Sequence, residues 1–388
     1  MFAKYTQIAP VTYGPGAISA VGETVKALGG QVALVVSDAG VIATGITQKA
    51  IDSIEAAGVK TVLFDKVEMD APDYSITIGA EMAVSVGADI VVGVGGGSSM
   101  DSAKAIALLA TNLADGTTIH DIIRFNPAKP FMPKPALKNV MVPTTSGTGS
   151  EVTFISVVGD TERKVKCGCI VVPTASILDP ELTLGLDPLI TAYTGMDAFS
   201  HASEALASVG INPHSDLLAM DAISRIVKNL PIAVADPMNA EARTELAIAA
   251  NWAGKAFQDS TVNVGHTIAH VIGAAYHVPH GIGCALATPV VEEKVASSRP
   301  EIFGKIARML GADVEDNDPA LGAKLADALR AFEKKVGIPS LQELGISHEQ
   351  CMDLLPDVVA DGMRHACSVP LTEGDLKDMM EKLYTLYR

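Results

Sequence analysis

Short apolar runs alternate with amphipathic stretches and glycine-rich turns up to about residue 180. Four runs have the length and composition of buried strands, at residues 31–38, 61–67, 88–97 and 139–149. Between the first two, the segment ITQKAIDSIEAAG places its apolar residues at helical spacing. Buried strands that alternate with helices are typical of a parallel sheet with crossover helices.

The pattern changes after SILDPELTLGLDP, where the strand signals stop. Long segments with helical spacing follow, at residues 190–208, 215–230, 240–257 and 320–337. We therefore expect two domains, an α/β domain with a parallel sheet over residues 1–183 and an all-helical domain over residues 184–388.

One helical stretch, from Ser260 to Val291, carries no formally charged residue and is long enough to cross a bilayer. Its four histidines, Asn263 and Pro279 would each need a polar partner in lipid. We interpret this stretch as the core of a soluble protein and expect no membrane partner.

Composition narrows the function classes further. The 388 residues carry a formal net charge of −16 without a basic cluster, which argues against nucleic acid as a partner. The five cysteines form no CxxC pair, and the N-terminus lacks the pattern of an export signal. We expect a cytoplasmic protein.

The strand ADIVVGV runs into the glycines Gly95, Gly96 and Gly97 and then, through Ser98, into a helix. Glycines allow close approach of a ligand to the backbone, and a helix N-terminus attracts phosphate. The spacing is not GxGxxG, so an ordinary glycine turn is the alternative to a pyrophosphate site.

A second polar loop, residues 143–151, follows another strand with hydroxyl side chains and two glycines. Loops at the carboxyl ends of parallel strands share one crevice, so both loops can face one ligand. Asp38 ends the first of these strands, where a carboxylate accepts hydrogen bonds from ribose hydroxyls and repels a 2′-phosphate. This favours NAD over NADP; a helix-capping Asp is the alternative.

The histidines of GHTIAHVIGAAYHVPHG offer a metal site. His266 and His270 are one helical turn apart, and Asp197 and His201 repeat that spacing on another predicted helix. Two helices with two inward ligands each are a recurring way to build a metal site. His280, held between Pro279 and a glycine, marks a helix end. The alternative is a set of hydrogen-bonded core histidines.

Four motifs, GGGSSMDSAK, VPTTSGTGSEVT, TGMDAFSHASEA and GHTIAHVIGAAYHVPHG, occur in the order typical of one family. The chain resembles the iron-containing (group III) alcohol dehydrogenases, the family of lactaldehyde reductase and 1,3-propanediol dehydrogenase. The resemblance implies a dehydroquinate synthase-like fold. It also implies a metal held by Asp197, His201, His266 and His280, and it places His270 beside the nicotinamide and substrate.

The resemblance also implies a set of cofactor-binding residues. They are Gly95, Gly96, Gly97, Ser98, Thr144, Thr145 and Thr148, with Asp101 and Lys104 in the helix after the glycines. Asp38 joins this set because of its position at the strand end, as described above. A hairpin lysine of the family that reaches the cofactor ribose matches Lys166, with Lys164 as the alternative.

The reaction implied is NAD-linked oxidation of an alcohol or reduction of an aldehyde. The metal polarises the carbonyl or lowers the pKa of a bound alcohol, and His270 relays the proton. Three imidazoles and a carboxylate suit Fe(II), Zn(II) or Mn(II), and Fe(II) follows from the resemblance. The alternatives are a dehydroquinate-synthase-like lyase or cyclase, and a non-catalytic nucleotide- or metal-binding protein.

The substrate expected is a small, short-chain aldehyde or alcohol. Near the C-terminus, where relatives carry a Cys and then Asn-Pro-Arg, this chain has Arg364 and His365. A guanidinium beside an imidazole can receive an anionic head group, as in sulfoacetaldehyde or succinic semialdehyde. A solvated Arg364 and a neutral substrate are the alternative. We also expect Phe257 in the substrate pocket, His277 as a polar helix-end residue, and a homodimer or higher homo-oligomer.

Overall fold

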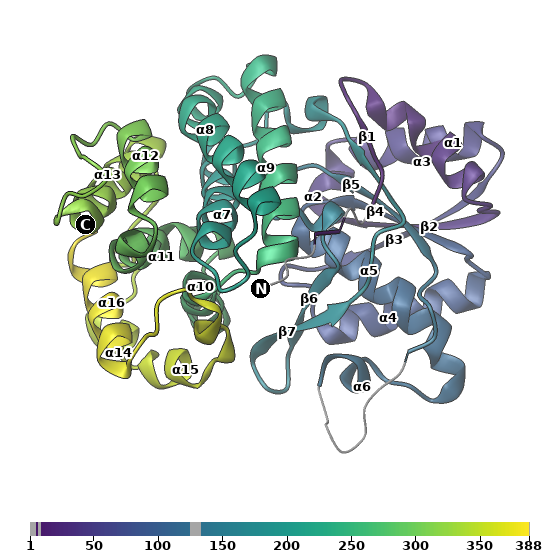
Figure 1. The fold of residues 1–388 in the computed structure, drawn as a ribbon. Helices are drawn as coiled ribbons and strands as arrows, with labels where there is room; N and C mark the ends of the chain where they lie inside the picture. The colour runs from purple at the N-terminus through teal and green to yellow at the C-terminus, as the bar shows by residue number, and fades with distance from the viewer. Residues whose placement is uncertain (1–4, 7–8, 125–132, 388) are drawn as a thin grey trace. The chain divides into compact units, whose positions relative to one another are not determined.

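The strands expected in the first half belong to one sheet in the computed structural model, which describes residues 5–6, 9–124 and 133–387 (Figure 1). The described chain divides into two compact units. The sheet unit holds most of the described residues up to Thr183, and the helical unit begins at Leu184. Residues 5–6 and 146–148 also belong to the helical unit. Each unit is considered by itself below.

The sheet has six parallel strands in the order β1-β8-β5-β4-β2-β3. Their bounds are β1 Val11–Tyr13, β2 Val32–Asp38, β3 Lys60–Val67, β4 Ile90–Gly95, β5 Lys138–Pro143 and β8 Ala175–Leu178. After β3 the chain returns to pair β4 with the other side of β2, so the strand order reverses between β2 and β4. The carboxyl ends at such a reversal are where α/β sheets bind ligands.

Alternate residues of the central strands enter two separate cores. Val92 and Val94 pack with α1 (Val21–Ala27) and α3 (Ile46–Ala56), whereas Val91 packs with α4 (Asp73–Val86) and α5 (Gly97–Asn112). Burial on both faces explains why these strands read as continuous apolar runs. An antiparallel hairpin, β6 Ile155–Asp160 and β7 Val165–Ile170, lies beside α5 and α6 (Ile119–Ile123).

The second unit is built from helices, as the sequence predicts. They include α7 Pro188–Leu206, α8 Pro213–Ala235, α9 Ala240–Ser260, α10 Val264–Tyr276, α11 His280–Val295, α12 Pro300–Met309, α13 Leu321–Val336, α14 His348–Met352, α15 Leu355–Ala360 and α16 Glu373–Thr385. Proline at the first position begins α7, α8 and α12, where its missing N–H costs nothing. Their apolar faces share one core.

The uncharged stretch from Ser260 to Val291 spans two separate helices, α10 and α11. They part at His277, which caps α10 with a left-handed φ of 54°. Among the described residues, no helix combines the length and apolarity needed to span a bilayer.

Candidate metal centre and nucleotide loop

One stripe of α7 carries three buried polar side chains. Asp197, His201 and Glu204 follow one another at helical spacings of four and three residues, so they share a face. All three are at most 5% exposed. Such side chains are costly to bury unless they meet partners or a metal.

Two further histidines come from the adjoining helices. His266 lies in the first turn of α10 and His280 begins α11, directly after its N-cap Pro279. The turn at His277 thus separates two helices that pack against each other and each present one imidazole. His277 itself is exposed at the helix end, as predicted.

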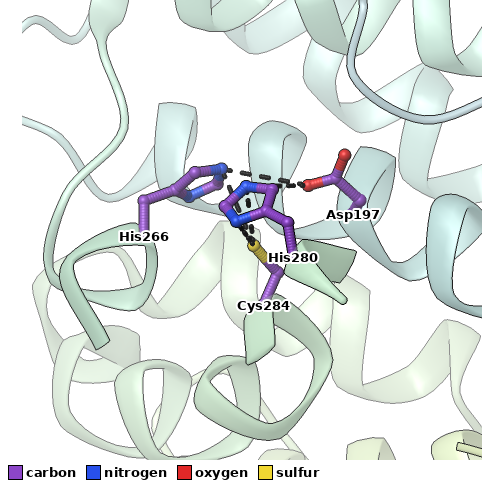
Figure 2. A group of neighbouring side chains, drawn as sticks. All are labelled: Asp197, His266, His280 and Cys284. Atoms are coloured by element: carbon purple, nitrogen blue, oxygen red, sulfur yellow. Dashed lines mark hydrogen bonds and ion pairs between the residues drawn. The ribbon is translucent and has the colours of Figure 1, made fainter. Parts of the chain in front are cut away.

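The carboxylate of Asp197 lies among three imidazoles. Its Oδ1 atom is 3.8 Å from Nδ1 of His201, 4.0 Å from Nε2 of His266 and 3.7 Å from Nε2 of His280. Figure 2 shows Asp197, His266 and His280 pointing toward one another. Asp197 Oδ1 and His201 Nδ1 are buried without a hydrogen-bond partner among the described residues. Unsatisfied donor atoms at these separations fit a metal ion, so Asp197, His266 and His280 form a metal-binding site, and His201 as a further ligand stays a prediction.

Glu204 holds the ring of His266 in place. Its Oε1 lies 2.7 Å from His266 Nδ1, and its Oε2 accepts a hydrogen bond from the backbone N–H of Asn263. A carboxylate on Nδ1 leaves Nε2 free for a metal. Our sequence analysis did not assign Glu204 a role; its position seven residues after Asp197 on one helix face is the signal that would have found it.

Cys284 also joins the cluster. One donor atom each from Asp197, His266, His280 and Cys284 lie within 4.8 Å of one another (Figure 2). The Sγ atom is 3.4 Å from His280 Nε2 and 3.9 Å from His266 Nε2. Burial raises the pKa of the Cys284 thiol to about 11. The sequence analysis gave this cysteine no role.

Aromatic contacts surround the centre. His201 stacks on Phe257 of α9 at a centroid distance of 4.4 Å and lies 4.6 Å from the ring of His266. Burial lowers the pKa of His201 to about 4, which keeps the ring in the neutral form that binds metals. His270, one turn after His266, has its ring 5.1 Å from that of His280. Its donor atoms are outside the group of four.

A second group of donors, Asp73, His120 and Asp160, lies in the sheet unit. Arg124 donates two hydrogen bonds to Asp160, at 2.7 and 2.8 Å, and lowers the pKa of that carboxyl to about 2. Thr161 and His120 engage Asp73 at 2.7 and 2.8 Å. Arg124 thus pairs with Asp160, and hydrogen bonds from His120 and Thr161 hold Asp73, in a network that joins α4, α6 and the hairpin.

In the sheet unit, the glycine loop forms the turn from β4 into α5. Gly95 has a φ of +153°, and a Cβ there would lie 2.5 Å from Ser99 Oγ, so only glycine fits. The N-cap Gly96 makes no side-chain cap to α5. The first N–H groups of this 16-residue helix thus have no capping side chain, as a phosphate site requires.

Asp38 lies at the end of β2, beside this turn. Its Oδ1 caps α2 (Ala39–Ala43) by accepting from Val41 N at 3.0 Å, and its Oδ2 accepts from Ser99 Oγ at 2.8 Å. The capping alternative is thus present in the structure. A carboxylate oxygen has a further lone pair, and the ribose contact stays a prediction.

The threonine loop lies next to the glycine loop. Thr144 N donates to Gly95 O at 3.0 Å, and a Cβ on Gly96 would lie 3.5 Å from the side chain of Thr145. Thr148 belongs to the helical unit. Asp101 accepts from Ser150 Oγ and Val157 N, and the buried Lys104 donates to the carbonyl of Ile155 at 2.6 Å. Both side chains therefore hold the hairpin against α5; a contact of Asp101 with the cofactor remains a prediction.

Lys166 is linked to the glycine loop through Asp70. Its Nζ lies 2.7 Å from Asp70 Oδ1, and the backbone N–H of Asp70 donates to Ser98 Oγ at 3.1 Å. The side chain of Lys166 is only 8% exposed, whereas Lys164 sits in the hairpin turn with a φ of 56°. Which of the two lysines contacts the cofactor stays a prediction.

Arg364 and His365 lie in the 3-10 helix Gly362–Ala366, which packs against α10. Thr267, the residue after His266, donates to Asp361 Oδ1 at 3.2 Å and so ties this segment to the metal-bearing helix. Arg364 Nε is buried without a hydrogen-bond partner among the described residues, and His365 is exposed.

Comparison with known proteins agrees with this architecture. Residues 9–180 match the family model "Iron-containing alcohol dehydrogenase", and residues 191–385 match "Fe-containing alcohol dehydrogenase family, C-terminal". The chain belongs to the iron-containing alcohol dehydrogenase family, whose members are oxidoreductases.

Three relatives illustrate the likeness. An NAD-dependent methanol dehydrogenase of Bacillus methanolicus is 37% identical over 341 residues, which cover 87% of this chain and 88% of that protein. The crystal structure of a 1,3-propanediol oxidoreductase matches with a TM-score of 0.92 at 32% identity, covering 99% of this chain and 100% of that one. Sulfoacetaldehyde reductase of Bifidobacterium kashiwanohense, solved with NAD+, gives 0.87 at 29% identity, with 99% of both chains covered.

Proposed function

We propose that this protein interconverts short-chain aldehydes and alcohols with NAD(H), using Fe(II) held by Asp197, His201, His266 and His280. The observation that carries this is the buried Oδ1 of Asp197, which has no hydrogen-bond partner within the described chain and lies 3.7–4.0 Å from three imidazole nitrogens. The relatives that act on methanol, propanediol and sulfoacetaldehyde support a small substrate.

Each group of the site has a role in the proposed reaction that follows from its chemistry. When bound, the metal polarises the substrate oxygen and the nicotinamide gives or accepts hydride. Glu204 fixes the tautomer and orientation of His266. Phe257 covers His201 and forms an apolar wall of the substrate pocket. His270 moves the proton of the alcohol hydroxyl through its imidazole.

The sheet unit supplies the cofactor site under this proposal. The pyrophosphate takes the first N–H groups of α5, next to Gly95 and Gly96, and Thr144 and Thr145 border it. Asp38 stands where the strand order reverses and opposes a 2′-phosphate, so NADH is preferred to NADPH.

The test is an assay of metal-replete protein with NADH and a panel of short aldehydes, followed by nicotinamide absorbance. Oxidation of NADH in the presence of aldehyde, and reduction of NAD+ with the matching alcohol, is the expected result. No turnover with any aldehyde or alcohol would contradict the proposal. Light scattering after size exclusion tests the homodimer or higher oligomer.

An anionic head group is the narrower candidate for the substrate. Arg364 supports it, because its buried Nε has no hydrogen-bond partner in the part of the chain that the structure describes, and because its segment is tied to α10 one residue after His266. We expect kcat/KM to favour an anionic aldehyde over a neutral one of similar length. The double variant Arg364→Ala with His365→Ala should reverse that ratio, and an unchanged ratio would contradict the candidate.

A further inference from the structure

Cys284 is placed on the metal centre by the helix that carries His280. The two residues are four positions apart on α11, so their side chains lie on one face, and His280 Nε2 is 3.4 Å from Sγ. Cys284 is 1% exposed, and α11 continues past it without a break. Its sulfur therefore has a fixed position beside the donor atoms of Asp197 and His266 (Figure 2).

The separations are close to those of ligands around one ion, with two of the four distances slightly longer. Metal–ligand bonds of about 2.0–2.3 Å in a tetrahedron place the ligand atoms about 3.3–3.8 Å apart. The sulfur lies 3.4 and 3.9 Å from the two histidine nitrogens, and Asp197 Oδ1 lies 3.7 and 4.0 Å from the same atoms. The Cys284 sulfur thus lies at about the same distance from the histidine nitrogens as the carboxylate oxygen of Asp197 does.

The other buried cysteines of the helical unit lack such an environment. Cys351 lies 4.0 Å from the carbonyl of Met380, and Cys367 pairs through its backbone with Ser208. Neither belongs to a group of metal-ligating donors among the described residues. Cys284 is thus distinguished by its neighbours rather than by its burial.

We propose that the Cys284 thiolate is a further ligand of the metal held by Asp197, His201, His266 and His280. The inference rests on the proposed function for the presence of the metal. On binding, the S–H bond breaks, a metal–sulfur bond forms, the proton leaves to water, and the metal keeps its oxidation state. A sulfur donor selects Fe(II), Zn(II) or Co(II) over the harder Mn(II) and Mg(II).

The test uses full-length protein loaded with Co(II), which shows a near-ultraviolet charge-transfer band when a thiolate is bound. The wild type and Cys351→Ala, the matched buried control, should both show the band. Cys284→Ala should bind Co(II) with the band lost. A band that persists in Cys284→Ala, or a Co(II)-loaded wild type without one, would overturn the proposal.

A second measurement needs no variant. X-ray absorption of the iron- or zinc-loaded wild type should show a sulfur neighbour at about 2.3 Å from the metal. A shell of nitrogen and oxygen alone would overturn the proposal even if Cys284→Ala failed to fold.

Neither readout depends on turnover. An enzyme that is active with NADH but shows no metal–sulfur bond would therefore refute only the assignment of Cys284 as a ligand. A metal–sulfur bond in a protein that turns over no aldehyde would refute the proposed activity alone.

Discussion

Glu204 Oε1 lies 2.7 Å from His266 Nδ1, and this one contact decides which ring nitrogen faces the metal. Replacing the carboxylate by an amide in Glu204→Gln weakens that restraint. We expect the affinity for metal to fall by about 10–100-fold, as for other carboxylates behind a ligating histidine. Titration with a chromophoric chelator measures this, and an unchanged affinity would contradict the positioning role.

Gly265 gives a second way to disturb the same contact without changing a ligand or the carboxylate. A Cβ on Gly265 would lie 2.5 Å from Glu204 Oε1, so Gly265→Ala must displace the carboxylate. Alanine favours a helix over glycine by about 1 kcal/mol, so a loss of metal cannot come from helix propensity. We expect metal affinity to fall as in Glu204→Gln.

The matched control for Gly265→Ala is Gly374→Ala in α16. Its added Cβ would meet Thr372 Oγ1 at 3.6 Å, an ordinary contact. The metal affinity of this variant should equal that of the wild type. Equal affinities for Gly265→Ala and Gly374→Ala would show that displacing Glu204 has no effect.

The histidines of α10 and α11 that lie at the centre should separate by role. His266→Ala and His280→Ala each remove a donor near Asp197 Oδ1, so both should lose most bound metal and nearly all activity. His270→Ala should keep the metal and lose rate. Metal content by mass spectrometry beside kcat distinguishes the two classes, and loss of metal in His270→Ala would place that ring among the ligands.

Cofactor preference can be tested without harming the fold. Asp38→Asn keeps a good capping side chain for α2 but removes the negative charge. We expect the preference for NADH over NADPH to narrow while the melting temperature stays close to that of the wild type. Asp38→Gly should relax the preference too and also lose the contact to Ser99. A wild type that prefers NADPH would refute the role of Asp38.

Glu292 in α11 should make stability depend on pH. Burial, with the nearby Glu204, raises the pKa of Glu292 to about 8 from its usual 4.5. Because the pKa is higher in the folded state than in the unfolded state, the free energy of unfolding is greatest below the unfolded-state pKa. It falls as the pH rises toward about 8, by up to about 1.4 kcal/mol per pH unit. The melting temperature of the wild type should therefore fall between pH 5 and pH 8 relative to Glu292→Gln. Parallel curves would show that Glu292 titrates normally.

Much of the fold could be predicted because its elements carry strong local patterns. β2, β4 and β5 are buried on both faces and read as apolar runs, and α7 and α13 repeat with helical spacing. β1 spans three residues and takes its place only by pairing with β8, a partner far along the chain. No local pattern encodes such a pairing.

The residues of the candidate site likewise differ in whether a local sequence pattern predicts them. Asp197, His201, His266 and His280 belong to motifs whose spacing suggests shared helix faces. Glu204 lies in the same motif as Asp197 and His201, but its role, like that of Cys284, depends on which helices pack together. Asp70 is a similar case, since its left-handed φ of 64° and its links to Ser98 and Lys166 arise only from the folded loop.

The turn at His277 divides the imidazoles between α10 and α11, while Asp197 belongs to α7. An ion that binds all three helices therefore acts as a cross-link, and it exists only while the helical unit is folded. Its stabilisation grows with the logarithm of the free metal concentration and does not act on the strands. When free metal is scarce, the helical unit therefore loses this contribution to its stability, whereas the sheet unit keeps its own.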